Sequence, residues 1–326
     1  MRVLVTGANG FLGRHILKEL QSQGHTPLAF VRSEQSAHQM QQQGFDVQMG
    51  RLDHTRELID IFKDMDAVIH AAGGGKAVRP ESFFENNVDP TQHLFNALSQ
   101  STVKRCLLIS SLAAAGPSPR HSPKKNDALL EPISPYGKSK AAAERIALAH
   151  QDHLQVGILR PPAIYGPADI RLLPLFKTTQ KGFVPVPGGL PKSLCLIHVE
   201  DCARAVVQAL SANYPSGSAF FVDDGAIHSI EELVQIMGQA LHTRPKLIPV
   251  PKWLLSATAA ASTQLARLMQ RDPWLTPSKV HELAQPHWIC DSNATQESLN
   301  WKPEVKLDFG IPSTAQWYQQ QGWLKS

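Results

Sequence analysis

The chain has 326 residues, of which 42% are hydrophobic and 18% charged, and a formal net charge of +4. These are ordinary values for a soluble globular protein, and the small net charge, without any block of lysine or arginine, gives no reason to expect nucleic acid as a partner. The length allows one large α/β domain, or one domain with a smaller lobe.

Four cysteines, at positions 106, 195, 202 and 290, show no Cys-x-x-Cys spacing and no Cys/His spacing typical of metal ligands. We expect reduced, mostly buried thiols in a cytoplasmic protein, and no metal site. The chain enters a motif as early as Gly7, so we expect no signal peptide. The apolar stretch from Trp253 to Met269 is too short and too polar to span a bilayer, and packing on the core is favoured over an interfacial position.

The first half of the chain alternates short apolar runs with helical patterns. Apolar strands separated by helices are typical of a parallel sheet covered on both faces. The expected strands are Arg2–Thr6, Pro27–Val31, Asp46–Met49, Ala67–His70, Cys106–Ser110 and Gln155–Arg160. The expected helices include Leu12–Gln23, Arg56–Lys63 and Glu81–Ser99. This pattern predicts an α/β fold with a doubly wound parallel sheet.

The pattern changes after Arg160, where proline and glycine become dense. The strands expected beyond this point are Ser193–Val199 and Ala219–Asp223, and the helices are Glu200–Ala212, Ser229–Leu241, Lys252–Met269 and Thr276–Leu283. We therefore expect a core over residues 1–165 and a mixed region over 166–326. Within the mixed region, 193–225 returns to the core, whereas 166–192 and 226–326 form most of a smaller, mainly helical C-terminal substrate lobe.

A glycine-rich turn, Gly7-Ala8-Asn9-Gly10-Phe11-Leu12-Gly13, joins the first strand to the first helical pattern. Glycines at these positions allow a tight turn, close approach of the backbone to a pyrophosphate, and close packing of the helix on the strand. The start of the helix offers unpaired N–H groups and a partial positive charge to the phosphates. This context predicts a dinucleotide site rather than a plain glycine turn. The residues expected at the cofactor are Gly7, Asn9, Gly10, Phe11, Leu12 and Gly13.

The end of the second strand indicates which nicotinamide cofactor binds. An acidic residue about 20 positions past the turn would hold a ribose 2′-hydroxyl, whereas an arginine suits a 2′-phosphate. Here Arg32 follows Val31, and no acid stands at the tip of the strand. We therefore expect NADP(H) to be favoured over NAD(H). The alternatives are that Arg32 is a solvated surface residue and that nearby Glu34 blurs the preference.

A tyrosine and a lysine stand four residues apart, as Tyr136 and Lys140, at the start of a helical pattern. This spacing places both side chains on one face of the helix. A tyrosine ordinarily loses its proton near pH ~10, and an adjacent ammonium group favours the phenolate, which suits the pair for proton transfer at neutral pH. A buried strand upstream ends in Ser110-Ser111, and parallel sheets build their sites at such carboxyl ends.

Together these segments resemble the extended short-chain dehydrogenase/reductase superfamily, the group similar to NAD-dependent epimerases and dehydratases. The resemblance rests on Thr6-Gly7-x-x-Gly10-x-x-Gly13, on Ser110-Ser111 followed by Gly116, and on Tyr136-x-x-x-Lys140. The resemblance covers residues 1 to about 225, and it is weaker from there to the C-terminus. Its nearest branches are those of 3β-hydroxysteroid dehydrogenase and dihydroflavonol reductase. The resemblance implies a Rossmann-like core that binds NAD(P).

By this resemblance, Ser111 polarises the substrate oxygen, although Ser110 could exchange roles with it. Tyr136 exchanges a proton with that oxygen, and Lys140 assists the tyrosine and binds the nicotinamide ribose. Asn87, within Asn86-Asn87-Val88, would position Lys140, unless it is an ordinary polar helix residue. Further cofactor contacts are implied for Asp53, Ala71, Ala72, Gly73, Pro161, Pro162 and Ile164.

Two departures from the family pattern bear on these roles. Arg51 stands where relatives usually carry an aspartate that contacts adenine, so Asp53 would take over that contact. Ala163 stands where nucleotide-sugar enzymes often carry an asparagine. Together with the apolar segments 172–176 and 183–187, which we expect to line the substrate site, Ala163 favours a small, largely apolar ketone or alcohol.

We therefore expect an NAD(P)-dependent oxidoreductase that acts on a small molecule, without nucleic acid or a transmembrane span, and a homodimer stays open. One alternative is a nucleotide-sugar epimerase or dehydratase. The other is a non-catalytic NADP(H)-binding regulator or assembly factor, which is disfavoured because such relatives typically lose the tyrosine or the lysine, and both are present here. His198 and Asp201 are expected to be mainly structural.

Overall fold

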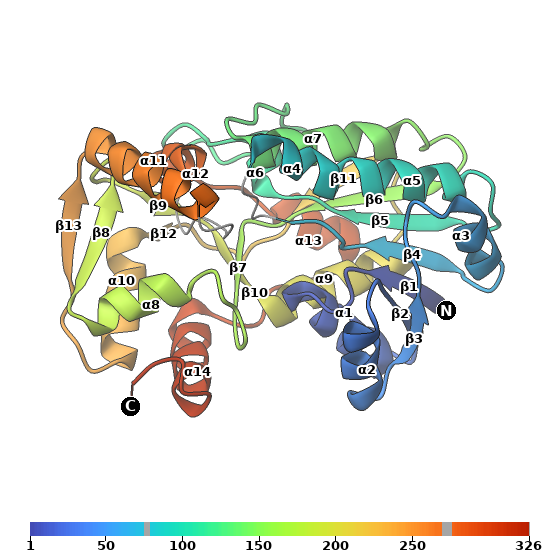
Figure 1. The fold of residues 1–326 in the computed structure, drawn as a ribbon, viewed down its shortest axis with the longest axis horizontal. Coiled ribbons are helices and arrows are strands. Elements are labelled where there is room, and N and C mark those ends of the chain that lie inside the picture. The colour runs from blue at the N-terminus through green and yellow to red at the C-terminus, as the bar shows by residue number, and fades with distance from the viewer. Residues whose placement is uncertain (75–78, 269–275, 326) are drawn as a thin grey trace.

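The computed structural model describes residues 1–74, 79–268 and 276–325 (Figure 1). Its core is a seven-stranded sheet in the order β11-β6-β5-β4-β1-β2-β3, and all neighbouring strands in it are parallel. The strands are β1 (Arg2–Thr6), β2 (Thr26–Val31), β3 (Asp46–Met49), β4 (Ala67–His70), β5 (Arg105–Ile109), β6 (Gln155–Arg160) and β11 (Ser218–Phe221). The expected doubly wound α/β sheet is confirmed.

Both faces of this sheet are buried because its side chains alternate between two apolar clusters. In β1, Val3 and Val5 join one cluster, and Leu4 joins the other. The helices on the Val3 side are α1 (Phe11–Ser22), α2 (Glu34–Gln42), α9 (Val199–Ser211) and α13 (Asn293–Leu299). Those on the Leu4 side are α3 (Thr55–Phe62), α5 (Asp89–Leu98) and α7 (Pro135–Leu148), with α4 (Pro80–Asn87) packed on α7. Figure 1 shows these two layers below and above the sheet.

The strand order reverses between β1 and β4. From β1 the chain proceeds to β2 and β3 on one side, and from β4 it proceeds to β5, β6 and β11 on the other. The connections that leave these two strands therefore diverge, and ligands of open parallel sheets bind in the crevice at this point, beyond the carboxyl ends of the strands.

A lobe drawn at the left of Figure 1 extends from this edge of the sheet. Its helices are α8 (Leu173–Gln180), α10 (Ile230–Ala240), α11 (Lys252–Leu268), α12 (Pro277–Leu283) and α14 (Leu307–Gln320). Small sheets pair β7 (Ala163–Tyr165) with β10 (Leu196–His198), β8 (Phe183–Pro187) with β13 (Lys246–Val250), and β9 (Ser193–Leu194) with β12 (His228–Ser229) and β14 (His287–Trp288). The short helix α6 (Leu112–Ala115) follows β5.

The structure corrects two of the expected helices. The segment expected as one helix over 81–99 is two, α4 and α5, with Val88 between them, because Pro90 has no N–H to continue the hydrogen-bond ladder. Helix α11 lies on the surface rather than in the core, since only Ala259 and Ala266 are buried among its described side chains. Met269, the expected last residue of that helix, lies outside the described residues.

Within the described residues, no helix is both long enough and apolar enough to cross a membrane.

Candidate active site

The glycine-rich turn after β1 has the conformation that a pyrophosphate cradle requires. Gly7 adopts a φ of +68°, and a Cβ built on it would lie 2.6 Å from the backbone of Ala71. A Cβ on Gly13 would lie 2.2 Å from the Gly7 carbonyl oxygen, so only glycine allows α1 to start this close to the turn. Gly10 caps α1 without a side-chain oxygen, which leaves the first N–H groups of the helix to an anionic ligand.

The other residues of the turn connect it to its surroundings. The Asn9 amide Nδ2 donates to the Ser36 hydroxyl of α2 at 2.9 Å. Phe11 is half-buried and meets the ring of His15 edge-on, and Leu12 packs against the apolar cluster below the sheet. The turn is thus held by α2 on one side and by the core on the other.

Arg32 lies at the same edge of the sheet as the turn. It follows the last residue of β2, its side chain is exposed, and Ser33 caps α2 by accepting from the backbone N–H of Ser36 at 3.3 Å. Because Asn9 also contacts Ser36, the first turn of α2 joins Arg32 to the glycine-rich turn. The expected contact of Arg32 with the ribose 2′-phosphate of a dinucleotide stays a prediction.

Asp53 does not present an isolated carboxylate. Arg51 donates to both of its oxygens, from Nε at 3.0 Å and from Nη2 at 2.8 Å, and holds the pKa of Asp53 at about 2. Arg51, which departs from the family pattern, thus forms an ion pair with Asp53, the residue expected to take over the contact with adenine. A contact of Asp53 with adenine stays a prediction.

A buried hydrogen-bond chain fixes the segment after β4. The Thr6 hydroxyl lies 2.7 Å from His70 Nδ1, and the Thr91 hydroxyl lies 3.1 Å from Nε2. Burial lowers the pKa of His70 to about 3, so the imidazole is neutral at physiological pH. Thr6 also accepts from the N–H of Ala72 at 3.2 Å. The 71–73 segment is therefore tied to the residue that precedes the glycine-rich turn.

Tyr136 and Lys140 lie in the first turns of α7, whose N-cap Ser134 accepts from the N–H of Gly137 at 3.0 Å. Lys140 is buried, and its Nζ donates to the carbonyl of Ile109, the last residue of β5, at 2.7 Å. Burial lowers the pKa of Lys140, and the charge of Arg171 contributes in the same direction. The lysine thus reaches the carboxyl edge of the sheet.

Asn87 supports this helix through the residue between tyrosine and lysine. Its Nδ2 donates to the Ser139 hydroxyl at 2.9 Å, and Ser139 donates in turn to the backbone carbonyl of Tyr136 at 2.8 Å. Gly73 fits beside this group, since a Cβ there would lie 2.4 Å from Asn87 Oδ1 and 3.3 Å from Lys140 Nζ. The side chains of Asn87 and Lys140 therefore both lie close to the backbone of Gly73.

The two serines after β5 have different surroundings. Ser110 is buried and donates to Glu144, which forms an ion pair with Arg160 at 2.8 Å. Ser111 is half-buried at the N-cap of α6, where its hydroxyl oxygen accepts from the N–H of Ala113 at 3.2 Å. The Ser111 hydroxyl proton is thus left for another partner, whereas Ser110 belongs to a buried polar network.

The segment after β6 runs along the same edge. The Pro161 carbonyl accepts from the N–H of Leu112 at 2.9 Å, and β7 pairs with β10. Pro162 and Ile164 are half-buried, and Ala163 is exposed. The expected contacts of Pro161, Pro162 and Ile164 with the nicotinamide stay predictions.

His198 and Asp201 have structural partners. His198 caps α9 by accepting from the N–H of Glu200 at 3.4 Å. The buried Asp201 carboxylate accepts from the N–H groups of Glu304 and Val305, at 3.0 and 2.9 Å. Asp201 thereby holds the C-terminal segment against α9.

Two residues missed at the sequence level belong to this region. The ring of Phe83, on α4, lies 6.0 Å from that of Tyr136 and provides an apolar neighbour. Glu282, on α12, accepts from the hydroxyl of Ser134 just before the tyrosine. Phe83 lies close to the Asn86-Asn87 motif and could have been considered, but no local pattern connects Glu282 with a serine 148 positions away.

The expected substrate lining is wrong at Phe176. Phe176 is fully buried, 5.1 Å from the ring of Tyr318, and Leu172, Leu173 and Leu175 pack against the same cluster. Phe176 therefore belongs to the core of the lobe, with the three half-buried leucines packed against it. In β8, Val184 and Val186 are buried, whereas Phe183 and Pro185 are exposed.

Three potential metal ligands come together beyond the carboxyl end of β11, where the two cysteines pack with Leu112 and Ala115 of α6. Side-chain atoms of Cys195, Asp223 and Cys290 lie within 4.8 Å of one another, although 95 positions separate the cysteines. Hydrogen bonding with Cys195 and burial raise the pKa of Cys290 well above its ordinary range. All four cysteines are buried and unpaired, as expected.

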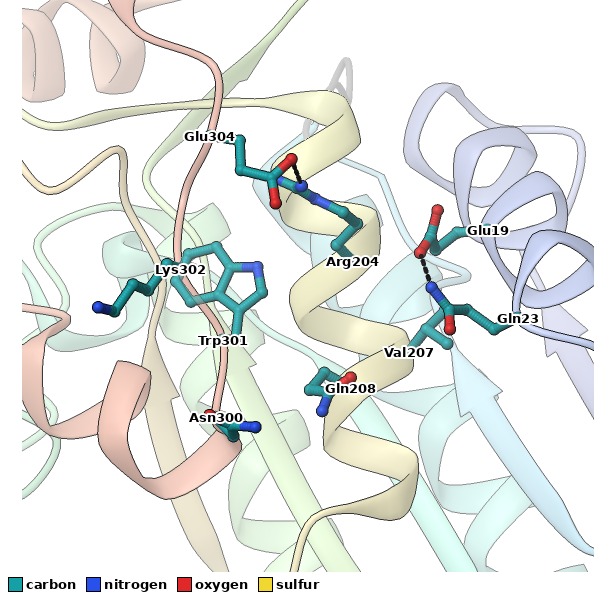
Figure 2. A pocket seen from close by; sticks show the side chains of 9 residues that line it. All are labelled: Glu19, Gln23, Arg204, Val207, Gln208, Asn300, Trp301, Lys302 and Glu304. Carbon is teal, nitrogen blue, oxygen red and sulfur yellow. Dashed lines mark hydrogen bonds and ion pairs between the residues drawn. The ribbon is translucent and has the colours of Figure 1, made fainter.

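A pocket of about 160 Å³ lies on the face of the sheet that α1 and α9 cover, and Figure 2 shows the side chains that line it. It lies between the C-terminal half of α1, the helix α9 and the 300–304 segment. Its lining is mostly polar, and Arg204 there is paired with Glu304. Because none of the expected site residues lines it, this pocket is separate from the candidate active site.

Fold and site together are those of an NAD(P)-dependent oxidoreductase of the extended short-chain dehydrogenase/reductase type. The chain belongs to the NAD dependent epimerase/dehydratase family, whose sequence pattern matches residues 3–222.

Named relatives cover nearly the whole chain. It is 30% identical to the ceramide reductase of Caulobacter vibrioides, over 99% of this chain and 96% of the relative. It is 26% identical to the UDP-glucose 4-epimerase of Vibrio cholerae, over 98% and 95%, and 27% identical to the 2-alkyl-3-oxoalkanoate reductase of Stenotrophomonas maltophilia, over 95% and 97%. The solved structure of gox2253 shares the fold, with a TM-score of 0.81 at 22% identity over 99% of each chain.

Proposed function

We propose that this protein is an NADP(H)-dependent carbonyl reductase or alcohol dehydrogenase for a small, largely apolar substrate. The observation that carries the proposal is the position of Tyr136 and Lys140, which α7 brings to the carboxyl edge of the sheet beside the glycine-rich turn. A lysine with both a backbone carbonyl of β5 and a neighbouring tyrosine has the arrangement that a proton-transfer site needs.

The residues present fit a dinucleotide. The turn leaves no room for a Cβ at Gly7 or Gly13, and the start of α1 carries no side-chain cap, so backbone donors face the expected pyrophosphate. When bound, the nicotinamide would supply or accept the hydride. Lys140 would hold the nicotinamide ribose, and Arg32 would hold the 2′-phosphate that distinguishes NADP(H) from NAD(H).

The reaction requires negative charge on the substrate oxygen to be balanced. In reduction, Tyr136 donates its phenolic proton to that oxygen, and the nearby Lys140 ammonium stabilises the phenolate that remains. Ser111 donates a hydrogen bond to the same oxygen and so polarises the carbonyl. Asn87 acts through Ser139 and the backbone, because its hydrogen bonds hold the helix that carries both groups.

An apolar substrate is supported by two features of the site. Phe83 lies beside Tyr136, and the exposed Ala163 offers no amide where a sugar could be hydrogen-bonded. The names of two relatives, a ceramide reductase and a 2-alkyl-3-oxoalkanoate reductase, agree with a carbonyl on an alkyl chain. The epimerase relative supports a nucleotide-sugar substrate as the second candidate.

A substrate panel tests the proposal. The purified protein is mixed with NADPH and with long-chain 3-oxo compounds, cyclic ketones or nucleotide sugars, and loss of NADPH absorbance is followed. We expect oxidation with the apolar ketones. An epimerase could show no net oxidation, so products with nucleotide sugars are also separated chromatographically. Conversion of the sugars alone would assign the protein to the second candidate.

We place the protein in the cytoplasm, because its four unpaired, buried cysteines suit a reducing compartment. Cell fractionation with a cytoplasmic marker enzyme tests this assignment. Co-fractionation with periplasmic or secreted proteins would contradict it.

A further inference from the structure

Helix α11 has an exposed face that ordinary surface helices do not show. From Trp253 to Ala266 the sequence contains no charged residue, yet most described side chains of this stretch are exposed or half-buried. Trp253 is 70% exposed, and Leu254 is 42% exposed. A solvent-facing helix normally places charged residues on its outer face, so this face is unsuited to water alone.

The apolar surface continues onto neighbouring loops. A Cβ on Gly188 would lie 2.9 Å from the carbonyl of Ala284 and 3.1 Å from Cε of Lys252, so these three segments meet. Each carries an exposed apolar side chain close by, and these side chains are Leu190, Trp253, Leu254 and Leu283. We call this set the α11 patch.

Two of the three segments that form the patch are basic and contain no acidic residue. The segments 170–199 and 233–268 contain no aspartate or glutamate, although the whole chain carries 28 acidic residues. Their basic residues are Arg171, Lys177, Lys181, Lys192, Arg244, Lys246, Lys252 and Arg267. Pairing of β8 with β13 brings the two segments side by side. These two segments therefore carry only positive side-chain charges, whereas basic and acidic residues nearly balance over the whole chain, which has a net charge of +4.

Two lysines lie directly beside the patch. Lys252 is exposed at the start of α11. Lys192 donates to the carbonyls of Leu283 and Gln285 at 2.7 and 2.9 Å, and burial together with the charge of Lys252 lowers its pKa to about 8. The nearby Glu282 does not offset this charge at the surface, since it is buried against Ser134 and Lys279.

We propose that the α11 patch docks on the surface of an anionic lipid bilayer, with Trp253 and Leu254 inserted at the interface and Lys252 among the headgroups. Tryptophan suits the membrane interface because its ring is apolar and its N–H is polar. A helix that lies in the interface combines such an apolar face with basic residues, and each lysine near an anionic surface contributes about 1 kcal/mol.

The charge pattern favours a bilayer over a second copy of the chain. A two-fold dimer through this patch would place the same basic segments against each other. An anionic membrane presents the opposite charge to all of them.

The patch adjoins the candidate active site. Helix α12 packs on α11 through Val280 and Ala259, and Glu282 of α12 is hydrogen-bonded to Ser134 at the N-cap of α7. Tyr136 follows two residues later. Docking would therefore bring the part of the lobe that adjoins Tyr136 to the membrane surface. An apolar substrate could then enter the site from the membrane. The docking proposal rests on the surface alone and would hold for another substrate.

Vesicle flotation tests the proposal with the full-length protein. Vesicles of phosphatidylcholine alone are compared with vesicles that also contain phosphatidylglycerol, at low and high salt. We expect binding to the anionic vesicles that weakens with salt, and quenching of tryptophan fluorescence by brominated lipid.

Variants locate the contact. We expect Trp253→Ser with Leu254→Ser to weaken binding at least about tenfold, and Lys252→Ala about fivefold, from the lost apolar burial and one lost charge. Phe309→Ser is the matched control, because Phe309 is 68% exposed on α14 and should leave binding unchanged. Melting temperature and NADPH affinity of each variant establish that it is folded.

Absence of binding to anionic vesicles would overturn the proposal, as would equal binding by the folded Trp253/Leu254 double variant and the native chain. Sedimentation provides a further check. A native dimer that the double variant converts to a monomer would also overturn the proposal and assign the patch to a second copy.

Discussion

At the scale of single residues, the two adjacent serines after β5 have different roles because their hydroxyl groups have different hydrogen-bond partners. Ser110 points into the Glu144–Arg160 ion pair, and Ser111 sits at the start of α6 with its hydroxyl proton available. The sequence pattern left their roles interchangeable. The geometry favours Ser111 as the group that faces the substrate.

We predict different losses for the two serines. Ser111→Ala should lower kcat about 10²-fold, because a hydrogen bond to the developing negative charge is lost, with little change in melting temperature. Ser110→Ala should instead lower the free energy of unfolding by about 1–3 kcal/mol, since it removes a partner of a buried carboxylate. Steady-state kinetics and denaturant unfolding of both variants measure this. Equal kcat for Ser111→Ala and the native chain would contradict the assignment.

A second residue-scale prediction concerns Arg32 and the cofactor. Arg32→Ala should weaken NADPH binding about 10- to 100-fold and NADH binding little, because only NADPH carries the 2′-phosphate. Fluorescence titration with both cofactors measures the two affinities. Arg2→Ala is the control, since Arg2 begins β1 at the opposite edge of the sheet. Equal losses for the two cofactors would remove Arg32 from this role.

At the scale of elements, the strands of the core could be predicted closely from sequence. Four of the six strands expected in the first half match the observed bounds, β2 starts one residue earlier than expected, and β5 is shifted by one residue at both ends. The reason is physical: strands of a parallel sheet are buried on both faces and form short, continuous apolar runs.

Elements of the lobe were harder to predict. Helix α14 was missed because Pro312 lies inside it and a proline ordinarily argues against a helix interior. Helix α8 starts with Pro174 in its first turn, within a stretch that reads as a loop. The exposure of α11 could not be predicted either, because an uncharged helical sequence suits a core and a membrane surface equally.

One contact between elements has a pH dependence. His228, on β12, lies 2.7 Å from Asp224 just beyond β11 and so links the lobe to the sheet. Burial lowers the pKa of His228, but Asp224 and Glu232 raise it more, and the net pKa lies above 6.5. The stabilisation from the protonated imidazole is thus complete below about pH 6.5 and is lost as pH rises through the higher, folded-state pKa.

We therefore predict that the native chain loses more thermal stability than His228→Gln when pH is raised from about 6 to about 8. Melting temperatures across this range measure the difference. His242→Gln, a change at an exposed position, should behave as the native chain does. Parallel curves for the native chain and His228→Gln would show that the contact does not titrate in this range.

At the scale of the whole molecule, the topology explains why local motifs predict so much of the candidate site. The strand order reverses between β1 and β4, so the residues that follow β1, β4 and β5 meet at one edge. The turn and the serine motif each follow one of these strands, the tyrosine motif begins α7, whose Lys140 bonds the end of β5, and each motif can be found by itself. The contact of Ser134 with Glu282 joins the core to the lobe over 148 positions, and no local pattern contains it.

The central claim is that Tyr136 transfers the proton, and Tyr136→Phe tests it most directly. The change removes the phenolic proton and keeps the ring that lies beside Phe83. The measurement is kcat for reduction of a substrate identified in the panel, together with NADPH affinity, and Tyr214→Phe, whose hydroxyl bonds the Ala209 carbonyl in the core, is the control. We predict that Tyr136→Phe lowers kcat by about 10²–10⁴-fold with NADPH affinity retained. A kcat close to that of the native chain would contradict the account even though the fold is right.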